Sequence, residues 1–200
     1  KGKKRMKLSM NWLSDFCDCS DIPVRDYCER MTDTGSKVEG YEALGSEIEN
    51  VVVGQVLSLE RHPDSDHLWI CRVDLGEEER QIVTGAQNVH EGDLVPAALH
   101  NSYLPGGVHI TKGKLRGVES CGMLCSYKEL GLTEHDCPEA YADGIWILND
   151  EGCEVGEDMN VVIGNDDSIV EFEITNNRPD CYSLLGLARE TAAAFNVPMR

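Results

Sequence analysis

Three cations recur at every second position in one short stretch of a mostly acidic chain. Lys112, Lys114 and Arg116 alternate with Gly113 and Leu115. Alternation is the side-chain period of a β-strand, so the spacing predicts that all three cations leave one face of one strand. Cations in such a row can contact successive phosphates of a nucleic acid, and each neutralised phosphate adds to the salt dependence of binding. The alternative is a solvated strand face without a ligand.

A second group of polar side chains lies in the segment HPDSDH, where His62, Asp64, Asp66 and His67 have the donor types of a cation site. Asp and Ser side chains next to Pro63 also favour a tight turn, which explains the same residues without a metal. We therefore expect a turn and no metal site.

Motifs of nucleophilic or nucleotide-dependent catalysis are missing. The sequence has no Walker-type loop, G-x-G-x-x-G, G-x-S-x-G or H-E-x-x-H segment. Its nine cysteines are an odd number, and neither Cys17-x-Cys19 nor Cys121-x3-Cys125 has the partner spacing of a zinc site. Cys125 is followed by Ser126, but no basic side chain is placed by spacing to activate either. We expect no catalytic, metal or cofactor-binding residue, and buried thiols in a reducing cytoplasm.

The overall charge argues against generic affinity for nucleic acids or membranes. The formal net charge is −18 and the isoelectric point is about 4.6, whereas such affinity normally shows as a basic surface. No apolar run is long enough to span a membrane. Lys1–Arg5 is basic but precedes no apolar segment, so it is not a secretory signal. We expect a disordered tail or a cloning scar over 1–5, with native sequence from about Met6.

Hydrophobic periodicity predicts helices and a strand at each end of the chain and a β-rich middle. Residues 6–10 alternate as a strand, a helix begins at Pro23, 169–174 alternates again, and 184–195 has a helical apolar stripe. Short strands separated by turns every eight to twelve residues indicate a barrel or sandwich. These strands are expected over 51–59, 68–75, 81–84, 94–99 and 144–148. Roughly five strands in roughly 100 residues favour a small closed barrel of the oligonucleotide/oligosaccharide-binding (OB) type.

The predicted fold class is therefore α+β, with a five-stranded OB-type β-barrel inserted into a small, discontinuous helical/α+β domain. We place the first part of the small domain at 6–45, the barrel at 46–152, and the second part at 153–200. The NNRPD segment, Asn176–Asp180, is expected to turn and to close the fold.

Three blocks, in order along Val51–Ser126, resemble the tRNA-binding OB module of several synthetase-associated proteins: GQVLSLERHPDSDHLWICRVDLG, RQIVTGAQNV and KGKLRGVESCGMLCS. Three flanking blocks resemble the bacterial phenylalanine–tRNA ligase beta subunit: MKLSMNWLSDF, GMLCSYKELGL and EFEITNNRPDCYSLLGLARETAA. The resemblance covers Met6 to Arg200.

This resemblance implies an N-terminal fragment of a longer beta subunit, an aminoacyl-tRNA synthetase component of the cytoplasm. In that family an α2β2 heterotetramer joins phenylalanine to tRNA(Phe) with ATP and magnesium. The aminoacylation site lies in the alpha subunit and the editing domain lies elsewhere in beta, so the fragment is expected to be non-catalytic. Partners implied are tRNA(Phe) and the alpha subunit, with neither membrane nor DNA.

Six residues are the predicted tRNA-binding positions. Lys112, Lys114 and Arg116 are the candidate phosphate contacts. The resemblance adds residues that would shape the same face: Ser120, Met123 and Ser126. His62 and Asp66 match the module's turn and are assigned a structural role. Few aromatic side chains are available to stack on nucleobases, because Trp69 is expected to point inward and only Tyr103 and Tyr127 lie nearby.

The charge of the predicted barrel limits its affinity. Between Glu47 and Gly152 the chain has 19 acidic residues and seven Lys or Arg, a net charge of −12. We therefore expect tRNA binding to be weak or dependent on assembly. The alternative function is a free-standing, dimeric OB-fold protein that binds tRNA or acts like a chaperone, which would not need the block EFEITNNRPDCYSLLGLARE. An isolated hydrolase has no support in the sequence.

Overall fold

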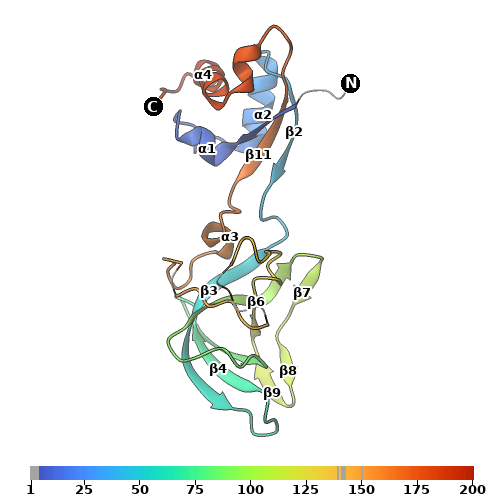
Figure 1. The fold of residues 1–200 in the computed structure, drawn as a ribbon, viewed down its shortest axis with the longest axis vertical. Helices are drawn as coiled ribbons and strands as arrows, with labels where there is room; N and C mark the ends of the chain where they lie inside the picture. Colours follow the sequence, from blue (N-terminus) through green and yellow to red (C-terminus); the bar gives the residue numbers. More distant parts are fainter. Residues whose placement is uncertain (1–4, 139, 141–142, 150) are drawn as a thin grey trace. The chain divides into compact units, whose positions relative to one another are not determined.

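The structure, a computed structural model, describes residues 5–138, 140, 143–149 and 151–200. The chain divides into two units (Figure 1). The discontinuous unit contains the residues up to Leu44 together with Asp166–Arg200, and the inserted unit is Gly45–Asn165. Residues 1–4 of the predicted tail lie outside the described residues. The prediction for Arg5 is wrong, because Arg5 begins a strand and pairs with Glu173.

The discontinuous unit is an antiparallel three-stranded sheet covered by helices. Its strands run in the order β1 (Arg5–Ser9), β11 (Ser168–Glu173) and β2 (Val38–Ala43). The helical segments are α1 (Met10–Ser14), α2 (Val24–Asp33), the 3-10 helix η1 (Pro179–Tyr182) and α4 (Leu184–Phe195). Alternation along β11 buries Val170 and Phe172 under the helices, as the sequence pattern predicts. The segment 176–180 turns and leads into η1.

Aromatic rings occupy the centre of this unit's core. Tyr27 packs edge-on against Phe172 at 6.4 Å and stacks on Phe195 at 5.7 Å. The Tyr27 hydroxyl and the Thr191 Oγ1 are hydrogen-bonded at 2.9 Å, which satisfies both buried polar groups. Residues from the two distant ends of the chain therefore build one core.

The inserted unit is a curled six-stranded sheet (Figure 1). Its main path is β10 (Gly122–Leu124), β6 (Leu94–Leu104), β3 (Glu49–Arg61), β4 (Trp69–Asp74) and β5 (Glu79–Thr84), with β7 (Val108–Ile110) paired to β6. A separate hairpin joins β8 (Gly113–Leu115) to β9 (Val118–Ser120). The register shifts in β3 beside Asn50 and Leu57, and such bulges increase the local twist that curls a sheet. Gly54, within β3, has no room for a side chain, because a Cβ there would lie 2.6 Å from Val73 Cγ1.

The two ends of the sheet path are joined by a few hydrogen bonds between β5 and the residues just before β10. The Cys121 amide donates to the Gln81 carbonyl at 2.8 Å, and the Val83 amide donates to Ser120 Oγ at 3.0 Å. Within the described residues no ladder joins β5 to β10. The predicted mixture of α and β structure is confirmed, in the form of an open, curled sheet with few helices.

Two parts of the inserted unit differ from the sequence prediction. Residues 144–148 form no strand; they run extended and donate singly from Trp146 to Cys125 O (3.1 Å) and from Leu148 to Leu94 O (2.8 Å). The unit also extends to Asn165 rather than 152. The reason is that residues 156 and 157 bond to both sides of Val53, and α3 (Met159–Val162) buries Met159 in the same core.

Among the described residues, every helix falls short of the length and apolarity that a bilayer crossing requires.

Candidate nucleic-acid interface

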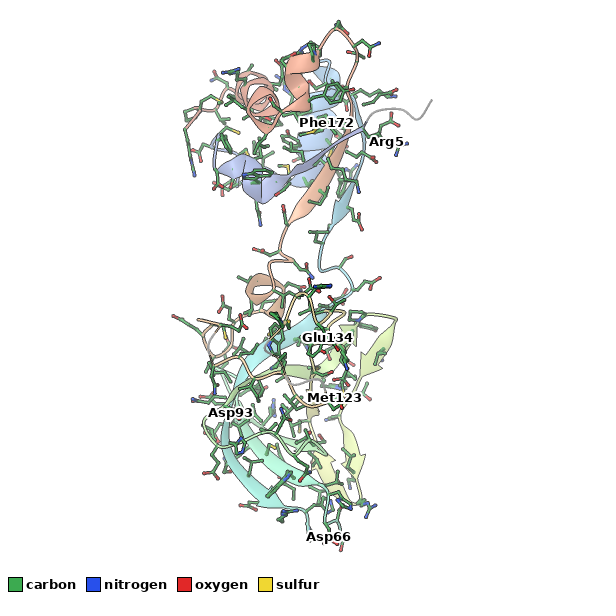
Figure 2. All side chains as sticks on the ribbon, in the orientation of Figure 1. Arg5, Asp66, Asp93, Met123, Glu134 and Phe172 are labelled. Carbon is green, nitrogen blue, oxygen red and sulfur yellow. The ribbon has the colours of Figure 1, made fainter. Side chains whose placement is uncertain are left out.

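An open cavity of about 780 Å³ lies in the inserted unit, beside β10 and the segment from β7 to β8. Four of the six predicted tRNA-binding residues line it: Lys114, Ser120, Met123 and Ser126. Met123, on β10, is labelled in Figure 2. Glu129 and Asp143 line the same cavity as Lys114, so the lining contains both acidic and basic side chains.

The three cations do not share one strand face, and that prediction is wrong. Only Lys114 belongs to β8, and the hairpin turns at Arg116 and Gly117. Both tip residues have positive φ, 46° and 89°, which is the backbone of a type I′ two-residue hairpin turn. The alternating cation pattern thus begins at Lys112, before β8, and ends at Arg116, in the turn, so its members lie in different environments.

Lys112 and Arg116 lie away from the cavity lining. Lys112 lines a separate depression of about 380 Å³ together with Glu78 and Glu119. The Arg116 guanidinium donates from Nη1 to the Asp64 carbonyl at 3.0 Å and so connects the hairpin tip to the turn after β3. In the part of the chain that the structure describes, neither Lys112 nor Lys114 forms an ion pair, although Glu119 lies opposite Lys114 in the hairpin register.

His62 anchors the β8–β9 hairpin through a hydrogen bond to the Leu115 carbonyl. Its side chain is 3% exposed, its Nε2 lies 3.1 Å from the Leu115 carbonyl, and its Nδ1 accepts from the Asp64 amide at 3.1 Å. Because a carbonyl only accepts and an amide only donates, these two contacts fit the tautomer in which Nε2 carries the proton and Nδ1 accepts. Asp66 contributes through its backbone carbonyl, which accepts from Arg61 Nη1 at 2.7 Å. These bonds fit the structural role predicted for both residues.

His109, which lines the cavity, is stacked on a second aromatic side chain, Tyr103. Tyr103 on β6 and His109 on β7 are directly opposite in the register, and their rings stack at 4.6 Å with 9° between planes. His109 lines the cavity. Tyr127, the other predicted stacking candidate, is 1% exposed and offers no ring face. Sequence reasoning missed His109, although the L-P-G-G turn after Tyr103 signals the hairpin that places the two rings opposite each other.

Comparison with known proteins matches this region to a family. The family model of the tRNA binding domain matches residues 51–144. The phenylalanine–tRNA ligase beta subunit of Clostridium acetobutylicum is 50% identical over 196 residues, which is 98% of this chain and 24% of that protein. That of Clostridium tetani is 48% identical over 96% of this chain and 24% of that protein. The resemblance to a phenylalanine–tRNA ligase beta subunit is confirmed.

The chain spans about a quarter of the length of these beta subunits. Among solved structures, a MetRS related protein from Pyrococcus horikoshii is 27% identical, covers 54% of this chain and 85% of its own, and has a TM-score of 0.36.

Within the block that carries the beta-subunit resemblance, the two serines are bonded internally. Ser120 Oγ accepts from the Val83 amide and donates to the Gly122 carbonyl at 2.9 Å, so it holds β10 near β5. Ser126 Oγ donates to Glu129 Oε2 at 2.8 Å, and the Ser126 amide donates to the same oxygen at 2.7 Å. Both hydroxyls therefore shape the cavity, and among the described residues Lys114 is the Lys or Arg that lines it.

All nine cysteines, each of which lies in the described residues, are free. Burial raises the pKa of the Cys125 thiol and, in the discontinuous unit, of the Cys19 thiol, each to about 12. Thiols with such pKa values are almost fully protonated at neutral pH, and the protonated form is neither a nucleophile nor a metal ligand. Burial therefore favours the protonated, unreactive form of these two thiols.

Proposed function

We propose that this chain is the tRNA-binding and scaffold region of a phenylalanine–tRNA ligase beta subunit and that it works in the cytoplasm. In this proposal it binds tRNA(Phe) within the ligase, beside the alpha subunit, while ATP and magnesium serve a catalytic centre elsewhere in the parent enzyme. One observation carries the proposal: Lys114, Ser120, Met123 and Ser126 gather around one open cavity inside the residues that match the tRNA binding domain.

The cavity supports contact with RNA through few charges. Lys114 lines it without an ion pair to a described residue, so a phosphate could be bound there without breaking a native interaction. Glu129 and Asp143 line the same cavity and would repel a second phosphate. The proposed binding is therefore weak in the isolated chain and stronger in the assembled ligase, where other surfaces contribute.

The finer fold proposal is that the curled sheet is an OB-type barrel of five principal strands. Its support is the contact between the ends of the sheet path, where Ser120 and Cys121 bond to β5. The residues that match the tRNA binding domain lie wholly within the inserted unit, which supports a module placed inside a second domain.

The alternative, a free-standing OB protein, leaves the discontinuous unit without a purpose. Phe172, in the EFEITNNRPD block, is fully buried among residues from both ends of the chain. A solitary OB module would not need this second core.

The test compares Lys114→Ala with Lys112→Ala, a matched loss of one lysine on the same segment but outside the cavity. We expect Lys114→Ala to weaken binding of tRNA and to lower the slope of log K against log salt by about one, because one phosphate contact is lost. Lys112→Ala should change the slope by much less. Fluorescence anisotropy with labelled tRNA over a salt series measures both, in the 200-residue chain and in the full-length ligase. Equal slopes for wild type and both variants would contradict the proposal.

A further inference from the structure

We propose that the Tyr103–His109 pair is a stacking platform for one unpaired nucleobase of the bound RNA. The inference rests on the proposed function, because it assigns a second contact to the same cavity. It concerns a different kind of chemistry, since the platform would recognise the flat face of a base rather than a phosphate.

The pair is exposed although its rings are aromatic. Tyr103 is 43% exposed and belongs to none of the three core clusters. His109 is exposed as well. In the described part of the chain neither the Tyr103 hydroxyl nor the His109 ring forms a hydrogen bond. Neither core packing nor polar bonding therefore accounts for the position of these two rings.

The backbone holds the rings ready for a third ring. Ser102–Ile110 and Leu104–Val108 pair on either side of the Tyr103–His109 pair, and the hairpin closes through Gly106 and Gly107 with φ of 78° and 76°. A near-parallel stack at 4.6 Å is within the favourable range of offset aromatic pairs. A flat surface fixed in this way loses little conformational entropy when a base is added to it.

The position of the platform fits single-stranded RNA. His109 lines the cavity that Lys114 also lines, so one aromatic ring and one unpaired cation face the same open space. Proteins that bind single strands combine these two elements, a ring for the base and a cation for the backbone. The other aromatic side chains nearby are unsuitable: Tyr127 is buried, and the face of Trp69 is covered by the Arg61 guanidinium at 4.1 Å.

The rival explanation is that the pair only stabilises the hairpin, as cross-strand aromatic pairs do. The variant Tyr103→Thr with His109→Thr separates the two explanations, because a Thr–Thr cross-strand pair retains β propensity while both rings are removed. Tyr103→Phe is the matched control, since it keeps the ring and loses only the hydroxyl.

The experiment measures binding of an unpaired oligoribonucleotide containing 2-aminopurine, and of a fully paired RNA duplex, to the chain and to the full-length ligase. Removal of both rings should weaken binding of the single strand by about fivefold to 150-fold, the loss expected for one stacked base. It should abolish quenching of 2-aminopurine, leave the salt slope unchanged and leave duplex binding unchanged. Tyr103→Phe should bind like wild type.

Each other outcome has a definite meaning. If Lys114→Ala weakens RNA binding and the double Thr variant does not, the platform is overturned and the proposed function stands. If the double Thr variant weakens single strand and duplex equally, the rings act only through the fold, and the platform is again overturned. If wild type binds no RNA in either protein, both proposals are overturned.

Discussion

The two units differ in net charge and in the environment of one cation. In the discontinuous unit, Arg5 pairs with Glu171 at 3.1 Å, and Arg178 pairs with Glu190 at 2.7 Å and with Asp180 at 2.8 Å. In the inserted unit Lys114 lines an open cavity and forms no ion pair with a described residue. Net charge also distinguishes the units, because the inserted unit has 22 acidic residues and seven Lys or Arg, a net charge of −15, whereas the discontinuous unit has 14 and 11, a net charge of −3. Both units pair cations within the fold, as Arg72 does with Glu79 and Arg80 with Glu78 in the inserted unit, and Lys114 differs from these in lining a cavity without an ion pair to a described residue.

The cores of the units are also separate. Among the described residues, one cluster of buried side chains belongs to the discontinuous unit and two belong to the inserted unit, and none of the three includes residues of both. Damage to one core is therefore expected to remain within its own unit.

The largest expected effect is that of Phe172→Ala, which removes a fully buried ring from the discontinuous unit. We expect the free energy of unfolding of that unit to fall by about 3–5 kcal/mol, while the inserted unit keeps its stability. Hydrogen exchange read by peptide during denaturant titration measures both units. Tyr41→Ala, at a 48% exposed position on the same sheet, is the control and should have little effect. Equal loss in both units would show that the two cores are energetically coupled.

A smaller and more local effect is expected for His62→Ala in the inserted unit. The change leaves the Leu115 carbonyl and the Asp64 amide without their partner, at a cost of about 1–3 kcal/mol. We expect faster amide exchange over 113–120 and weaker RNA binding, because Lys114 loses its support. His67→Ala is the control, since His67 is exposed and contributes its backbone carbonyl to Gln87. Unchanged exchange in the hairpin would show that His62 does not anchor it.

The smallest expected effect is on the stability of each unit in acid. In each unit a carboxyl group has a lowered pKa. The Arg178 guanidinium holds the pKa of Asp180 at about 2, and hydrogen bonds from Thr133 lower the pKa of Asp136. Because the folded pKa lies below the unfolded value of about 3.9, each group stabilises its unit above about pH 4. For Asp180 that contribution is lost as the pH falls from about 4 through about 2.

Asp180→Asn should therefore flatten the acid limb of the stability curve for the discontinuous unit alone. Asp136→Asn should do the same for the inserted unit alone. Denaturant midpoints by peptide-resolved exchange between about pH 5 and about pH 2 measure this, and an unchanged acid limb in either case would contradict the assignment.

The helices and strands that could be predicted from the sequence are those with one buried face, because burial of one face gives a regular spacing of apolar residues. The helix expected over 184–195 is α4 with the same bounds, and the strand expected over 169–174 is β11 displaced by one residue. The edge strand β2 was missed because most of its side chains are exposed and carry no alternation. The one-turn helix α3 is too short to show a period.

The site was predicted only in part. The residues that carry the family resemblance lie in one sequence block, whereas their positions around the cavity depend on turns and strand pairing. Lys114, Ser120, Met123 and Ser126 converge on the cavity, whereas Arg116 lies at the hairpin turn, and Lys112 lies before β8 and lines a separate depression. Alternation cannot reveal a turn when the tip residue has a long side chain and adopts positive φ. His109 depends on a cross-strand register, which a single sequence does not display. Contact of these residues with tRNA stays a prediction.

The free cysteines allow local unfolding of each unit to be followed by thiol alkylation. Four of them, Cys17, Cys19, Cys28 and Cys181, lie in the discontinuous unit, and the remaining five lie in the inserted unit. Because alkylating reagents attack thiolates, a buried and protonated thiol is modified only after its surroundings open. Mass spectrometry of iodoacetamide-treated protein would then time the opening of each unit separately. The cysteines of each unit thus serve as built-in probes of the local unfolding of that unit.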